Sequence, residues 1–66
     1  MVLKKIEIIG TSSEAFYKAV ENAVKEASKT VRGMKWAEVT GLSVKIEGEK
    51  IKEYKAAVKI AFEVER

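Results

Sequence analysis

Trp36 is the side chain of this 66-residue chain that is best suited to holding a flat molecule, because it is the only tryptophan. A tryptophan carries roughly 150–250 Å² of mostly apolar surface, and leaving it in water forfeits about 4–6 kcal/mol. The core of the protein, a second subunit or a planar ligand must therefore cover it. The function that we assign depends on which of the three does so.

The chain has few side chains suited to covalent catalysis or to metal binding. The chain contains no histidine, cysteine or aspartate, so it offers no Ser/His/Asp triad, no thiol nucleophile and no His/Cys zinc site. Its acidic residues are all glutamates, and no Glu-x-x-His motif or acidic loop concentrates them. We expect a protein that is not an enzyme, with no catalytic residues and no metal site.

A chain of this size predicts a single domain over residues 1–66. Such a small domain buries only about 60% of the surface of its unfolded chain, and without cysteine or histidine we expect oligomerisation to stabilise it. The net charge of +3 comes from scattered Lys and Glu, which predicts no nucleic-acid partner. No apolar run approaches the roughly 20 residues that span a bilayer, so we expect a soluble, cytoplasmic protein with no membrane partner.

The segment before Trp36 predicts a strand followed by a helix. Residues Val2–Ile9 are rich in β-branched side chains and alternate in part, which is typical of a strand, and Gly10 ends the pattern. Thr11 and Glu14 then have the spacing of a capping box, in which each side chain accepts a backbone N–H of the other residue. We predict that a helix begins here.

Residues 13–31 have the apolar period of a helix that packs against a sheet. The apolar side chains recur at intervals of three and four positions: Phe16, Val20, Ala23, Ala27 and Val31. The small alanines in the middle of this stripe allow strands to approach closely. Gly33 follows as a left-handed stop.

The period changes to two in the segment that contains Trp36. Before Gly41 the apolar residues are the odd-numbered Ala37 and Val39. Beyond Gly41 they are even-numbered: Leu42, Val44 and Ile46. A slip of one residue turns every later side chain to the opposite face of a sheet, so we predict a bulge or bend near Thr40 and Gly41. Residues 47–50 predict a hairpin turn.

The last strand has the clearest alternation in the chain. Its apolar residues are even-numbered: Tyr54, Ala56, Val58, Ile60, Phe62 and Val64. The order of elements predicts an α+β fold of the type β-α-β-β, with an antiparallel three-stranded sheet on one helix. Strand alternation then directs Trp36 and Lys55 away from the helix, unless Trp36 crosses to the core side where the helix joins the strand.

A series of short motifs also matches one family in order and spacing, over essentially the whole chain. The motifs are Lys4-Lys5, Gly10-Thr11-Ser12, Lys29-Thr30-Val31, Trp36-Ala37-Glu38-Val39, Glu53-Tyr54 and Ala61-Phe62. None is specific alone, but together they make the chain resemble the dodecins, which are small flavin-binding proteins. Trp36 falls where that family has its flavin-stacking tryptophan.

The resemblance implies a subunit whose sheet wraps its helix and which assembles into a hollow homododecamer. It also implies a flavin cofactor, FMN or riboflavin, held in pairs near two-fold axes with each ring stacked on Trp36. Such proteins are regarded as flavin stores, buffers or photoprotective proteins and not as enzymes.

Lys55 departs from the family pattern, which typically has glutamine at this position. An ammonium group donates three hydrogen bonds and accepts none, so it meets a flavin carbonyl but cannot receive the N3 proton of the ring. We therefore expect Lys55 at the polar edge of the flavin to weaken or alter its recognition. Lys45 is a further candidate contact, to the ligand's side chain or phosphate. The alternative is a dodecin-like shell with little or no flavin, acting as a structural or an ion- or anion-binding assembly.

Overall fold

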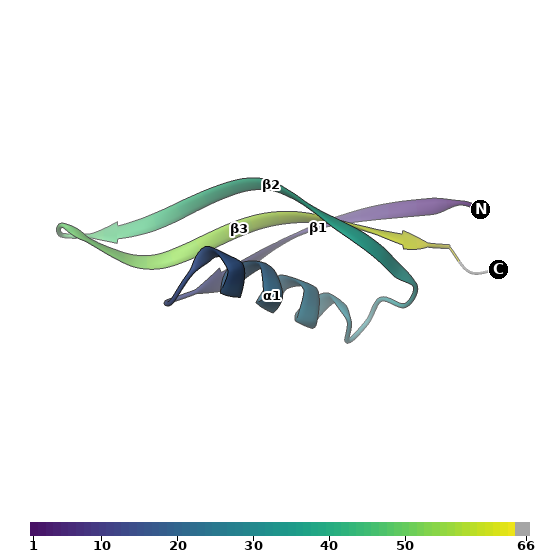
Figure 1. The fold of residues 1–66 in the computed structure, drawn as a ribbon, viewed down its shortest axis with the longest axis horizontal. Helices are drawn as coiled ribbons and strands as arrows, with labels where there is room; N and C mark the ends of the chain where they lie inside the picture. The colour runs from purple at the N-terminus through teal and green to yellow at the C-terminus, as the bar shows by residue number, and fades with distance from the viewer. Residues whose placement is uncertain (65–66) are drawn as a thin grey trace.

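The computed structural model describes residues 1–64 and contains three strands and one helix (Figure 1). In chain order these are β1 (Leu3–Ser12), α1 (Phe16–Ala27), β2 (Met34–Glu47) and β3 (Lys50–Glu63). The strands form one sheet in the order β1-β3-β2, and both pairs of neighbours are antiparallel. The predicted β-α-β-β fold is therefore confirmed.

The core lies between one side of α1 and the middle of the sheet. Its buried residues are at most 5% exposed: Ala19, Ala23, Ala27, Ala56, Val58 and Ile60. Partly buried apolar residues surround them: Ile6, Ile8, Val20, Val24 and Met34. The alanine stripe of α1 thus packs on the sheet, as its period predicts.

Gly10 allows the helix to lie this close to the sheet. A Cβ atom at Gly10 would lie 2.0 Å from the carbonyl oxygen of Ala19 and 2.8 Å from Cβ of Ala23. The prediction that Gly10 ends the first strand is wrong, because β1 continues to Ser12 and Gly10 pairs with Ala56 in the ladder. The glycine is needed for the approach of α1, not for a turn.

The helix is shorter than predicted at both ends. It begins at Phe16 with Ala15 as a cap that makes no side-chain hydrogen bond, so the predicted capping box is wrong. Thr11 is held in β1, and the N–H of Glu14 is instead bound by the hydroxyl of Ser12 at 3.0 Å.

At its C-terminus α1 ends at Ala27, well before the predicted end at residue 31. The hydroxyl of Ser28 donates to the carbonyl of Lys25 at 2.6 Å. The N–H of Thr30 donates to the carbonyl of Ala27 and forms a turn. Gly33 does have the left-handed conformation, with φ of 73°, but it leads into β2. Among residues 1–64, no helix is long and apolar enough to cross a membrane.

Strands β2 and β3 form a long hairpin with three irregularities in register. The predicted bulge is confirmed between Val39 and Gly41, and further shifts lie between Met34 and Trp36 and between Lys45 and Ile46. The predicted turn is also confirmed. Glu47 pairs with Lys50, and the first of the two loop residues, Gly48, has a positive φ of 65°, as hairpin loops of this length require.

Candidate functional site

Trp36 lies on the face of the sheet that points away from α1, which we call the outer face. The register places Trp36 opposite Ala61, whose neighbour Ile60 belongs to the core. Because successive side chains of a strand point to opposite faces, Ala61 and Trp36 face outward. Trp36 is 50% exposed, whereas Ala61 is fully buried. The indole therefore stands on the outer face beside a small, covered residue and keeps half of its surface free.

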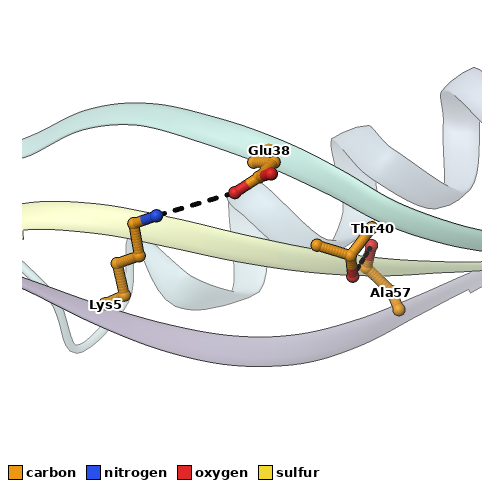
Figure 2. A network of polar contacts seen from close by, with 4 residues as sticks. All are labelled: Lys5, Glu38, Thr40 and Ala57. Atoms are coloured by element: carbon orange, nitrogen blue, oxygen red, sulfur yellow. Dashed lines mark hydrogen bonds and ion pairs between the residues drawn. The ribbon is translucent and has the colours of Figure 1, made fainter.

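The bulge in β2 sets which residues share the outer face with Trp36. The hydroxyl of Thr40 donates to the carbonyl of Ala57 at 3.2 Å and ties the bulge to β3 (Figure 2). Beyond it the alternation is shifted by one residue, so that Ser43 faces outward opposite Lys55. This local irregularity keeps both ends of a 14-residue strand amphipathic.

Two ion pairs lie on the outer face near Trp36. Lys5 of β1 reaches across β3 to Glu38 of β2, with 3.6 Å between Nζ and Oε1 (Figure 2). Lys35, next to Trp36, pairs with Glu63 at 3.6 Å. These side chains are roughly half exposed, so each pair contributes at most about 1 kcal/mol. They neutralise charge around the indole and leave its surroundings suited to a neutral ring.

Lys55 is a half-buried cation on the same outer face. It lies opposite Thr11 of β1 on one side and opposite Ser43 of β2 on the other. Side chains directly opposite in an antiparallel pair have Cβ atoms about 4.5–5.5 Å apart. Among the residues that the structure describes, no carboxylate lies within ion-pair distance of Lys55. Lys55 thus has a hydroxyl-bearing residue as its cross-strand neighbour on each side.

Lys45 is exposed, and it lies opposite Glu53 in the next outward-facing row. Ser43 and Lys45 are two residues apart on β2, so Lys45 is the diagonal neighbour of Lys55, about 7–8 Å away. The two predicted lysine contacts therefore belong to one region of the outer face.

Trp36 and Lys55 are far apart within one copy. Ala61, the partner of Trp36, lies six positions from Lys55 on β3, and at about 3.3 Å per residue this is roughly 20 Å along the strand. One chain therefore places both side chains on the predicted face but does not bring them together. A ligand that touches both needs Lys55 from a second copy.

Three residues that surround the candidate site on the outer face were not predicted from the sequence. Ala61 lies beside the indole, and Thr11 and Ser43 flank Lys55. Strand alternation places Ala61 on the outer face, but the cross-strand partners depend on register, which the sequence does not contain. Among residues 1–64, no group of three or more His, Cys, Asp or Glu side chains is arranged to hold a metal ion.

The chain is similar in sequence and fold to known proteins of one kind. The family model described as Dodecin matches residues 2–65. A dodecin of Thermus thermophilus is 36% identical over 64 residues, which are 97% of this chain and 93% of the relative. A solved dodecin from Streptomyces coelicolor has a TM-score of 0.95 at 34% identity, covering 98% of this chain and 93% of that one. A calcium dodecin from Mycobacterium tuberculosis, described as calcium chelating, has a TM-score of 0.86 at 29% identity, with coverage of 98% and 93%.

Proposed function

The chain belongs to the dodecin family, and on that premise we propose that it is a flavin-binding storage protein that stacks FMN or riboflavin on Trp36. In this proposal the protein is a homododecamer, and it buffers flavin without turning over a substrate. The observation that carries it is the position of Trp36, which is half exposed on the outer face. Its own chain leaves the indole free to cover an aromatic ring.

The chemistry of an indole suits storage and photoprotection. Stacking an aromatic ring on a flat base or ring system contributes about 1–3 kcal/mol. An electron passes readily from indole to a photoexcited flavin and returns, so the excited state is quenched and neither partner is consumed. The ion pairs beside Trp36 balance the positive and negative charge around this contact.

The separation of Trp36 from Lys55 supports a site built from more than one copy. A gap of roughly 20 Å along the strand is too long for one side chain to bridge. A second copy related by a two-fold axis brings its Lys55 toward the ring held on the first copy's Trp36. The outer faces of the two copies then enclose a pair of flavins.

Lys55 is proposed to contact the pyrimidine edge of the ring. Its ammonium donates to the flavin carbonyls but accepts nothing from the ring N3–H. The hydroxyls of Thr11 and Ser43, its cross-strand partners, are groups beside Lys55 that can accept this proton. We expect weaker flavin binding than a glutamine at this position would give, and Lys45 adds attraction for the phosphate of FMN.

The second candidate is a shell that binds anions and little flavin. It is favoured by Lys55 itself, a half-buried cation with two hydroxyl neighbours and no ion-paired carboxylate among residues 1–64. Two such cations facing each other across a two-fold axis repel one another unless an anion lies between them. Under this candidate, inorganic phosphate stabilises the assembly and FMN does not bind.

A flavin titration separates the two candidates. FMN and riboflavin fluorescence is recorded while wild-type protein is added, and the assembly mass is measured by light scattering. Storage predicts strong quenching, and Trp36→Leu raises Kd about 5- to 150-fold, which is the loss of about 1–3 kcal/mol of stacking. Tyr17→Leu, which removes another exposed aromatic ring on α1, serves as the matched control and leaves Kd unchanged. A large assembly that quenches no flavin supports the anion-binding shell instead.

A further inference from the structure

Lys55 differs from other lysines of the outer face because, within residues 1–64, no acidic residue lies opposite it. The other lysines each have a glutamate as cross-strand partner or in an ion pair: Lys5 with Glu38, Lys35 with Glu63, Lys45 with Glu53 and Lys59 with Glu7. The partners of Lys55 are Thr11 and Ser43, which carry hydroxyls. Lys55 therefore adds to this face a positive charge that no cross-strand carboxylate balances.

The neighbouring rows of the outer face do not supply the missing negative charge. The next row toward Trp36 is uncharged and consists of Ile9, Ala57 and Gly41. The next row away from Trp36 holds Glu53, whose cross-strand partner is Lys45. In the described part of the chain no ion pair joins Glu53 to Lys55. Because Lys55 is also half-buried, its charge is screened less than that of an exposed lysine.

The edge of the ring that we assign to Lys55 is the edge at which two redox states of flavin differ in charge. Oxidised flavin is neutral. Reduced flavin has gained two electrons and one proton, and in mildly alkaline solution it carries a negative charge shared by N1 and the carbonyl oxygen at C2. A positive charge near N1 stabilises this form. A hydrogen bond from an ammonium group to an anion is also roughly twice as strong as one between neutral groups.

We propose that the site prefers reduced, anionic flavin to oxidised flavin, and that Lys55 is the residue that sets this preference. The preference rests on the proposed function, because it requires a flavin held on Trp36 of one copy beside Lys55 of another. It concerns binding alone, since a reductant outside the protein supplies the electrons and the proton. Two Lys55 side chains that approach across a two-fold axis repel one another, and a pair of anionic rings neutralises both. The charge that weakens recognition of the neutral ring thus strengthens binding of the reduced one.

The size of the preference follows from the attraction between opposite charges. A charge within about 4–6 Å favours the oppositely charged form of a group by about 1–3 pKa units. The lower end of this range gives reduced flavin an advantage of about tenfold in Kd. For a two-electron couple, a tenfold change in the ratio of the two dissociation constants corresponds to about 30 mV. The potential of bound flavin is therefore expected to be at least about 30 mV higher in the wild type than in Lys55→Gln.

The test compares both redox states of riboflavin, which has no phosphate and so isolates the ring. Oxidised and dithionite-reduced riboflavin are titrated separately, without oxygen and in mildly alkaline solution, and binding is followed by the fluorescence of Trp36, the only tryptophan. In Lys55→Gln, Kd for the reduced form is expected to rise at least about tenfold relative to Kd for the oxidised form. A dithionite titration of the bound flavin against a redox dye measures the potential independently.

Two further variants separate the position of the charge from the net charge of the chain. Lys50→Gln removes the same charge at the hairpin turn, where Lys50 is opposite Glu47, and is expected to leave the potential unchanged. Lys55→Arg keeps a cation at the site and is expected to keep the potential above that of Lys55→Gln.

The outcomes distinguish this preference from the proposed function. Equal potentials in the wild type and Lys55→Gln, with oxidised riboflavin still bound, overturn the role of Lys55 and leave flavin storage standing. An equal fall in Lys50→Gln also overturns it, because net charge then decides the potential. If a folded wild-type assembly binds neither redox state, flavin storage fails and the preference fails with it.

Discussion

Replacing Gly10 with alanine tests how closely the helix must approach the sheet. The added Cβ would lie 2.0 Å from the carbonyl oxygen of Ala19, although ordinary van der Waals contact begins at 3.4 Å. The helix must therefore withdraw by about 1.4 Å, the difference between these two distances. Ala19 and Ala23, which are 0% and 3% exposed, would then lose contact with the sheet. Overpacking of this kind costs about 1–3 kcal/mol, occasionally more, and contact with rigid backbone favours the upper end.

The expected result follows from this cost. Alanine also restricts the conformations of the unfolded chain, which stabilises the folded state by about 0.4–1 kcal/mol. We therefore expect the free energy of unfolding to fall by about 2–3 kcal/mol in total. For a domain of this size, each kcal/mol lowers Tm by about 4–8 °C, which gives a decrease of roughly 8–24 °C. The measurement is thermal unfolding followed by circular dichroism at fixed protein concentration, because assembly makes Tm depend on concentration.

Gly41→Ala is the matched control for this substitution. A Cβ at Gly41 would meet only Cβ of Ala57, at 4.0 Å, and the backbone there does not have a positive φ. We expect its stability to stay within about 0.5 kcal/mol of the wild type. If Gly10→Ala melts within about 4 °C of the wild type, the close approach of α1 is not a constraint on this fold.

Two further substitutions test the outer face. Lys55→Gln introduces a group that both donates and accepts, so Kd for FMN is expected to fall about 2- to 12-fold, which corresponds to a net hydrogen bond of about 0.5–1.5 kcal/mol. Unchanged or weaker binding in the fluorescence titration contradicts the role given to Lys55. Glu38→Gln breaks the half-exposed pair with Lys5 and is expected to lower stability by at most about 1 kcal/mol. A loss of more than about 2 kcal/mol in thermal unfolding would mean that this pair holds the sheet together, contrary to the surface role given to it.

The outer face of the sheet carries the two side chains that we assign to the flavin, Trp36 and Lys55.

Much of the fold follows from local patterns in the sequence. The alternation of β3 predicts its buried face, and the change of parity after Gly41 predicts the bulge, which the structure confirms. Side-chain direction in a strand alternates from one residue to the next, so these features can be predicted without a structure. The ends of α1 could not be predicted in this way, because β1 extends to Ser12 and includes Thr11, which the capping box would require.

For the candidate site, the sequence by itself determined that Trp36 is the one tryptophan and that it contains no histidine, cysteine or aspartate. The resemblance added the expectation that Lys55 stands where glutamine is typical. Only the tertiary structure decided that Thr11 and Ser43 flank Lys55, and that Trp36 lies roughly 20 Å along the strand from it. Cross-strand neighbours depend on register, and register results from long-range packing and from bulges. The candidate residues can therefore be proposed from the sequence, whereas the distance between Trp36 and Lys55, on which the proposed second copy rests, appears only in the folded sheet.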